Sequence, residues 1–308
     1  MSIEVISIGS SSSGNSYIIR AGGRVLLLDV GLTAKKIVGA LSEIGLEPED
    51  VDAVFVTHEH VDHVKSVRAV CRKCCNADFY ATRGTVVGTP NFAYVPDDRL
   101  HIVSAGDTLI IGETREPSET GASEEAQHED RRNVRVDVFE ISHDAREPVS
   151  YSFTCGGEKL AVVTDTGIIT DSIFEAIKDA DKLVFESNHD EGLLMYGEYP
   201  YPVKMRIKSD HGHLSNKYAG ETLAELLGSR RTMTSDVACG PSGPGNGPAG
   251  DAAGSLKPLE IMLAHLSFHN NAPYYARNTI VPILEENGFE RDVDYTLTIA
   301  AKDEITTF

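Results

Sequence analysis

One short run, Thr57-His58-Glu59-His60-Val61-Asp62-His63, constrains this chain more than any other feature. It follows the apolar segment Ala53-Val54-Phe55-Val56, which is typical of a buried strand. It precedes Val64–Cys75, where apolar and basic residues recur with the spacing of an amphipathic helix. Three imidazoles and a carboxylate therefore share a strand-to-helix loop, in which side chains can converge. Imidazole and carboxylate ligands suit divalent Zn, Mn or Fe, so the run predicts a metal site.

Further Asp and His residues follow apolar segments elsewhere in the chain. They are Asp29 after Leu27-Leu28, His143 after Ile141-Ser142, Asp165 after Val162-Val163-Thr164, and His265 after Leu263-Ala264. Together with the histidine-rich run, and in this order, they resemble the sequence marks of the metallo-β-lactamase superfamily. The resemblance implies an α/β (α+β) fold: an αββα sandwich of two mixed β-sheets flanked by helices, with the site at one edge between the sheets.

The same resemblance implies a metal site with two divalent ions, which can be Zn, Mn or Fe. It implies seven ligands: His58, His60 and His143 for one ion, Asp62, His63 and His265 for the other, and Asp165 as the bridge. Asp62 then also counts as a catalytic residue, and Asp29 orients a ligand histidine from outside the ligand set. In such a site a hydroxide between the ions is the nucleophile.

Other motifs narrow the resemblance. They are Ser10–Ser16, Phe185–Asp190, Gly212–Asn216 and the His-Leu-Ser-x-x-Asn-Asn run at His265–Asn271. This set resembles the YycJ/WalJ group of bacterial metallo-β-lactamase-fold proteins. That group is associated with 5′→3′ exonuclease action on DNA and with DNA repair. The resemblance therefore implies a metal-dependent phosphodiesterase, most closely a nuclease that degrades DNA from its ends.

His213 lies just before an expected helix with Ser215 as its N-cap, and a helix N-terminus offers N–H groups to a phosphate. In tRNA-processing nucleases of the superfamily, a comparable histidine outside the metal ligands protonates the leaving group, and a glutamate holds it. By that resemblance His213 is the general acid and Glu186 its partner.

The remaining candidates are contacts to phosphate or substrate. They are Ser12, Asn15, Ser267, Asn270, Asn271, Lys204 and Arg206. A Ser/Gly/Asn cluster such as Ser10–Ser16 forms a tight turn and can also present N–H groups and hydroxyls to a phosphate. Basic side chains such as Lys204 and Arg206 either contact the nucleic-acid backbone or remain solvated surface charges.

The net charge of −19 opposes nonspecific attraction to nucleic acid, although two divalent ions would change the balance locally. Five cysteines show no disulfide pattern, and Cys71 and Cys74 fit the apolar face of a helix. No basic and apolar leader and no membrane-spanning apolar stretch is present. These features predict a cytoplasmic protein that does not associate with membranes.

The chain of 308 residues is predicted to form a single domain, 1–308, with two low-complexity insertions at about 113–132 and 229–258. The second insertion is rich in Gly, Pro, Ser and Ala, so the helix that starts at Ser215 is expected to end near Leu227. Leu100–Val103 and Thr108–Ile111 are expected to form a hairpin across Ala105-Gly106-Asp107.

Two other functions stay open. One is hydrolysis of a small phosphodiester or a thioester, and the other is a non-catalytic scaffold on the same fold. The complete ligand set argues against the scaffold. The sequence leaves open the native metal, the choice between DNA, RNA and a small diester, the polarity of degradation and the oligomeric state.

Overall fold

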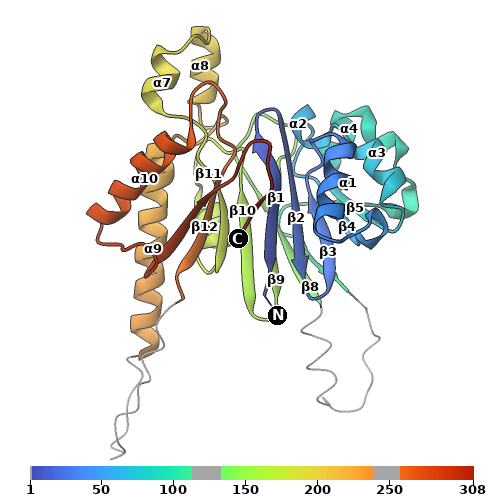
Figure 1. Cartoon of the computed structure of the whole chain (residues 1–308), viewed down its shortest axis with the longest axis horizontal. Helices are drawn as coiled ribbons and strands as arrows, with labels where there is room; N and C mark the ends of the chain where they lie inside the picture. Colours follow the sequence, from blue (N-terminus) through green and yellow to red (C-terminus); the bar gives the residue numbers. More distant parts are fainter. Residues whose placement is uncertain (1, 113–132, 239–256) are drawn as a thin grey trace, which may run out of the picture.

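A computed structural model describes residues 2–112, 133–238 and 257–308, and Figure 1 shows two β-sheets packed face to face between layers of helices. Each sheet has seven strands among the described residues. The first has the order β14-β1-β2-β3-β4-β5-β6 and the second the order β13-β12-β11-β10-β9-β8-β7. The predicted αββα sandwich is confirmed.

Both sheets mix parallel and antiparallel pairs. The first contains β1 (Glu4–Ser11), β2 (Gly14–Ala21), β3 (Arg24–Leu28), β4 (Ala53–Phe55), β5 (Asp78–Thr82), β6 (Leu100–Val103) and β14 (Thr306–Thr307). The second contains β7 (Thr108–Ile111), β8 (Val134–Glu140), β9 (Val149–Cys155), β10 (Glu158–Val163), β11 (Lys182–Glu186), β12 (Leu259–Ala264) and β13 (Tyr295–Ile299). Strands β3 to β6 run parallel, as do β10 to β13. Their carboxyl ends therefore meet at one edge of the sandwich.

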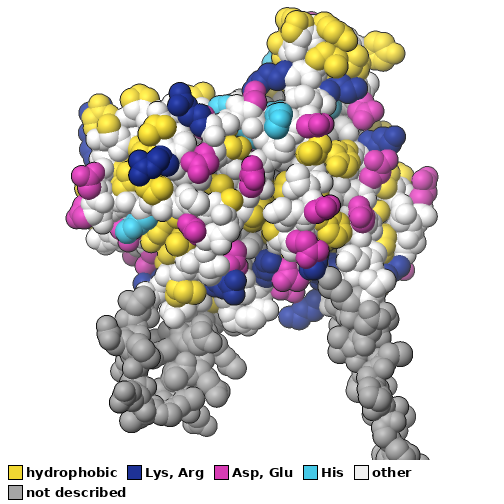
Figure 2. All heavy atoms as spheres, turned by 180° about the vertical axis from the view of Figure 1, so that it is seen from behind, with side chains coloured by type: hydrophobic (Ala, Val, Ile, Leu, Met, Phe, Trp, Pro, Cys, Tyr) yellow, Lys and Arg dark blue, Asp and Glu magenta, His cyan; other side chains and the backbone are white. Residues whose placement is uncertain are grey.

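Helices cover the outer faces. The first sheet carries α1 (Ala34–Glu43), α2 (Val61–Val64), α3 (Val67–Lys73) and α4 (Arg83–Gly88), and the second carries α6 (Asp171–Ile177), α9 (Asn216–Ala238) and α10 (Pro273–Glu286). Two short helices, α7 (Glu191–Tyr196) and α8 (Tyr201–Ile207), rise above the carboxyl edge. Their exposed apolar side chains, which include Met195, Tyr196, Tyr201 and Met205, gather at the top of Figure 2.

The core is layered because side chains alternate along each strand. Leu26 and Leu28 of β3 point between the sheets, whereas Leu27 points toward the helices. The ring of Phe55 lies 5.2 Å from that of Tyr151 and 5.5 Å from that of Phe153 in the opposite sheet. One apolar core thus joins both sheets. None of the helices in the described ranges is long and apolar enough to cross a membrane.

The expected helix Val64–Cys75 is shorter: Val64 ends the preceding helix α2, and α3 begins only at Val67, after a break at Ser66. The Ser66 N–H donates to Val30 O at 2.9 Å, and its hydroxyl donates to Leu32 O. These bonds to the loop after β3 replace helical bonds and tie the metal loop to the neighbouring strand. The predicted apolar face is confirmed, because Val64, Cys71 and Cys74 are all buried.

The expected hairpin of Leu100–Val103 with Thr108–Ile111 is wrong. Strand β6 pairs in parallel with β5, and β7 pairs antiparallel with β8. The turn between them passes from one sheet to the other, and Gly106, at φ 94°, donates its N–H to Val138 O. A local turn signal does not tell which strands pair, so it is compatible with either arrangement.

The expected end of the helix near Leu227 is also wrong, because α9 continues past Ser229 to Ala238. Arg230 is buried and donates to Ala180 O, and Arg231 lies 2.8 Å from Asp294 in an ion pair. These contacts anchor the end of the helix, which local composition does not reveal. Residues 239–256 of this insertion, and the whole of the first at 113–132, lie outside the described residues.

Candidate metal centre

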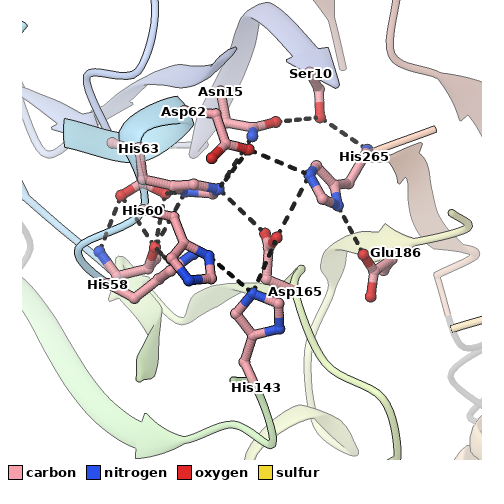
Figure 3. Close-up of polar contacts among 12 residues, drawn as sticks. Ser10, Asn15, His58, His60, Asp62, His63, His143, Asp165, Glu186 and His265 are labelled. Carbon is pink, nitrogen blue, oxygen red and sulfur yellow. Dashed lines mark hydrogen bonds and ion pairs between the residues drawn. The ribbon is translucent and has the colours of Figure 1, made fainter. Parts of the chain in front are cut away.

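All seven predicted ligands meet at the carboxyl edge of the sandwich, as Figure 3 shows. His58 and His60 follow β4, and Asp62 and His63 lie in α2. The other three, His143, Asp165 and His265, follow β8, β10 and β12. Strands from both sheets therefore deliver the donor atoms to one place.

Three of these strand ends have an unusual backbone. Asp29, Asp165 and His265 have φ values of 57°, 59° and 56°, in the left-handed region that residues with a Cβ rarely adopt. Asp292, at φ 64°, is the remaining non-glycine residue of this kind in the described part of the chain. Backbone strain concentrated at one site is a mark of function. Here it occurs where the chain leaves a strand and places a polar side chain in the site.

The first group of donors is His58, His60 and His143. His60 Nδ1 lies 3.2 Å from His143 Nε2, and the ring centroids of His58 and His60 are 4.6 Å apart. The second group is Asp62, His63 and His265. In it, Asp62 Oδ2 lies 3.6 Å from His63 Nε2 and 4.0 Å from His265 Nε2.

Asp165 lies between the two groups. Its Oδ1 is 3.4 Å from His265 Nε2 and 3.9 Å from His143 Nε2, and its Oδ2 is 3.5 Å from His63 Nε2. Donors about 2.1 Å from a tetrahedral ion lie about 3.4 Å from one another, so the spacing suits metal ligation. The arrangement also places one carboxylate within reach of both groups.

Several donor atoms lack any other partner. His58 Nε2, Asp165 Oδ2 and His265 Nε2 are buried without a hydrogen bond among the described residues. An unpaired buried polar atom costs about 1–3 kcal/mol, so such atoms are rare unless a ligand completes them. The residues present therefore fit divalent metal ions.

The charges around the donors favour a cation. Burial lowers the pKa of His63, but the carboxylates of Asp165, Asp29 and Asp62 outweigh it and raise that pKa to about 9. The pKa of His265 is likewise raised, mainly by Asp165, against the effect of burial. These shifts show that the carboxylates create a negative potential, which a metal ion can neutralise in place of the protons.

In the first donor group the pKa shifts go the other way. Burial lowers the pKa of His143 to about 4 and holds that of His58 well below its usual value. Both imidazoles are thus neutral near pH 7, which is the form that ligates metal.

Asp29 lies where the sequence predicted it, next to a ligand histidine. Its Oδ2 is 2.8 Å from His63 Nδ1, and its Oδ1 accepts from the N–H of Thr57 at 2.9 Å. The Thr57 hydroxyl donates to the same carboxylate and lies 3.0 Å from His58 Nδ1. Asp29 therefore orients one histidine directly and, through Thr57, contacts a second.

We expect Asp29→Asn to weaken metal binding by about 10–100-fold, because the outer partner of a ligand histidine sets its orientation and basicity. Asparagine tolerates the positive φ of this position, so the change removes mainly the charge. Titration of metal-stripped protein with Zn²⁺ or Mn²⁺ measures the effect. Asp52→Asn is the control, since Asp52 also accepts from a backbone N–H, that of Val25, but is not a member of the donor groups. Equal affinities in the two variants would contradict this role.

Glu186 is fully buried and holds two histidines at once. Its Oε1 lies 2.9 Å from His213 Nδ1 and 2.8 Å from His265 Nδ1, while its Oε2 accepts from the N–H groups of Thr166 and Leu214. Burial alone raises the pKa of Glu186, but the two histidines outweigh it and hold that pKa below its usual value. The predicted pairing with His213 is present, and the contact to His265 was not foreseen.

A cavity of about 260 Å³ opens beside the donors. Its walls include His213 and three of the predicted substrate contacts, Ser12, Ser267 and Arg206. Arg206 shares its charge with Asp144 through a two-pronged ion pair, in which Nη2 lies 2.9 Å from Oδ1. These three side chains remain candidates for contacts to a phosphate.

The other predicted substrate contacts have protein partners instead. Lys204 Nζ donates to the carbonyls of Met195 and Gly197 at 2.9 and 2.7 Å, so it holds the end of α7. Asn271 Nδ2 donates to Ser187 O, and the carbonyl of Asn270 accepts from Asp190 N–H. Asn15 Nδ2 lies 3.1 Å from His63 Nε2. None of these four residues lines the cavity, and their contact with substrate stays a prediction.

Sequence reasoning missed other residues that line or support the site. Asn188 and Tyr199 line the cavity, and the Ser10 hydroxyl accepts from His265 N–H at 2.8 Å. Thr57 connects Asp29 with His58, as described above. Thr57 directly precedes the histidine-rich run and Asn188 follows β11, so their positions were available as signals. Nothing local marks Tyr199.

Comparison with known proteins identifies the family to which this architecture belongs. The model of the metallo-beta-lactamase superfamily matches residues 11–188, and this segment contains six of the seven predicted ligands, all but His265. The chain belongs to the metallo-β-lactamase superfamily. The metallo-beta-lactamase fold protein YhfI from Bacillus subtilis superposes with a TM-score of 0.60 at 15% identity, covering 99% of both chains, which supports the fold.

Two curated relatives within the metallo-β-lactamase superfamily match nearly the whole chain. Exodeoxyribonuclease WalJ of Streptococcus pneumoniae is 31% identical over 302 residues, 97% of this chain and 94% of that protein. Exodeoxyribonuclease YycJ of Bacillus anthracis is 32% identical over 283 residues, 92% of this chain and 89% of that protein. The predicted resemblance to the YycJ/WalJ group is confirmed.

Proposed function

We propose that this protein is a metal-dependent phosphodiesterase that degrades DNA from its ends in the 5′→3′ direction. The observation that carries the proposal is the meeting of all seven metal donors with the His213–Glu186 pair at one place, where five of the donors and His213 line one cavity. Similarity along nearly the full length to two proteins named exodeoxyribonucleases supports DNA as the substrate.

Two divalent ions, Zn, Mn or Fe, are part of this proposal. One would be held by His58, His60 and His143, the other by Asp62, His63 and His265, with Asp165 shared between them. Bound there, such ions polarise the phosphoryl group and lower the pKa of a water. Asp29 and Glu186 orient His63 and His265 by accepting from their Nδ1 atoms, which leaves each Nε2 for a metal.

The chain itself supplies the proton for the leaving oxygen. His213 Nδ1 faces Glu186, so Nε2 is the ring nitrogen left for the substrate. Phosphodiester cleavage leaves an alkoxide, and a positioned acid that protonates it contributes about 10²–10⁴-fold. Arg206, Ser12 and Ser267, on the cavity wall, would hold the phosphate oxygens. A cytoplasmic role in DNA repair belongs to the same proposal and agrees with the free thiols of Cys71, Cys74 and Cys75.

The test uses DNA and RNA strands, single and double, labelled at either end and incubated with purified protein and Zn²⁺, Mn²⁺ or Fe²⁺. We expect labelled 5′ ends of DNA to be released first as short products, while a 3′ label stays on a shrinking strand. Release from RNA alone would replace DNA with RNA as the substrate. Cleavage restricted to small phosphodiesters or thioesters, or no reaction in a metal-loaded protein, would contradict the proposal.

A further inference from the structure

Three aromatic rings form a row at the mouth of the cavity. The ring centroid of Tyr199 lies 5.6 Å from that of His269, which lies 5.0 Å from that of Phe268. Lys302 Nζ follows, 3.6 Å from the centre of the Phe268 ring. The members of this aromatic row (Tyr199, His269 and Phe268) come from the α7–α8 connection and the loop after β12, and Lys302 comes from the segment after β13.

The row begins in the cavity and ends in solvent. Tyr199 lines the cavity together with Ser267, the residue directly before Phe268. The Phe268 side chain is 64% exposed, and His269 is exposed as well. A ring that is mostly exposed contributes little to the stability of the fold through burial. An exposed ring beside a functional cavity is more simply explained by something that it contacts.

The chemistry of the row suits unpaired nucleobases. Every base has a π face that stacks on an aromatic ring, and nearby cations attract the phosphates of the same strand. Lys302 supplies such a cation at the Phe268 end of the row, and Arg206 lines the same cavity as Tyr199. A protein partner would favour a continuous apolar patch. The row is instead interrupted by His269 and flanked by the Ser267 hydroxyl and Lys302.

We propose that the aromatic row stacks on the unpaired bases of the DNA strand whose phosphate occupies the cavity. This inference rests on the proposed function and specifies its substrate. In a duplex, the faces of the bases are covered by their neighbours. The row therefore selects single-stranded DNA ends, or ends that fray before they are cut.

The experiment compares a short oligothymidylate with a strand of equal length whose sugars carry no bases. Both present the same phosphates, so their difference in kcat/KM measures the contribution of the bases. We expect the wild-type protein to prefer the thymidylate about tenfold or more, as the loss of one stacked base predicts. Phe268→Leu keeps an apolar side chain without a π face and should reduce that preference several-fold, whereas Phe268→Tyr should retain it.

Tyr94→Leu is the matched control. Tyr94 is 51% exposed and has the Arg68 guanidinium 3.9 Å from its ring centre, so it is a similar pair of ring and cation, but it is not on the cavity wall. The Tyr94→Leu variant should therefore show the same preference for bases as the wild-type protein. If the wild-type protein and Phe268→Leu degrade DNA with the same preference for bases, the inferred stacking on the aromatic row is wrong, but the proposed function stands. A wild-type protein that degrades no DNA would overturn both this inference and the proposed function.

Discussion

Asp165→Ala is expected to lose one or both bound metal ions and to reduce DNA hydrolysis by at least about 10³-fold. The carboxylate of Asp165 lies within 4 Å of the Nε2 atoms of His63, His143 and His265, so it reaches both donor groups. Loss of the ions removes several kcal/mol of transition-state stabilisation, and each 1.36 kcal/mol is a factor of ten in rate. Elemental analysis of the purified variant gives the number of ions per chain.

The positive φ of Asp165 requires its own control, because alanine is strained in that conformation. Asp165→Asn avoids the strain and removes the charge, and it should also lose metal. Asp292 has a similar φ of 64° but is exposed and is not a member of the donor groups, so Asp292→Ala reports the cost of the strain alone. Occupancy by two ions in both Asp165 variants would show that this carboxylate is not the bridge.

His213→Ala is expected to keep its metal ions and its thermal stability while turnover of DNA falls by about 10²–10⁴-fold. His213 is outside the seven proposed ligands, and 15% of its side chain is exposed, so its removal leaves the ions in place and the core intact. The lost activity is the protonation of an alkoxide. A diester that releases an activated phenol needs no such proton, so the variant should hydrolyse it almost as fast as the wild-type protein.

Two further variants separate this role from others. His211→Ala removes an exposed histidine close in sequence, whose Nδ1 lies 3.1 Å from the Ser142 hydroxyl, and should change neither rate. Glu186→Gln should impair both substrates, because Glu186 also holds the proposed ligand His265. Equal losses on the two substrates in His213→Ala, or loss of metal, would exclude His213 as the general acid.

The net charge of −19 opposes the binding of DNA, which is also negatively charged, but the charge at the metal site can differ from that of the whole chain. Four of the acidic side chains, Asp29, Asp62, Asp165 and Glu186, lie at the site, where they raise the pKa of His63 or of His265. Divalent ions bound there would reverse the sign of the local potential, which decides whether a phosphate enters the cavity. Whole-chain charge describes solubility and long-range attraction, and it says little about a site that binds its own cations.

Much of the site could be predicted because the relevant signals are local. An imidazole or carboxylate directly after a buried strand must emerge at the end of that strand, and the spacing of the run from His58 to His63 allows its side chains to converge. The seven ligands, Asp29 and the His213–Glu186 pair all follow from such positions together with the family resemblance. The substrate contacts of Lys204 and Asn271 stay predictions, because the same polar groups that bind a phosphate also bind backbone carbonyls, as they do in this structure.

The sequence by itself therefore predicted the sandwich fold, the family and the donor set through its resemblance to a known family, since the motifs that carry the resemblance are short segments. The tertiary structure alone decided that β7 pairs with β8 and not with β6, and that α9 continues to Ala238. It also decided the left-handed backbone of Asp165 and His265, and it brought Tyr199, Phe268 and Lys302 together from separate segments. These features depend on contacts between residues far apart in the chain, whose free energy no local pattern contains.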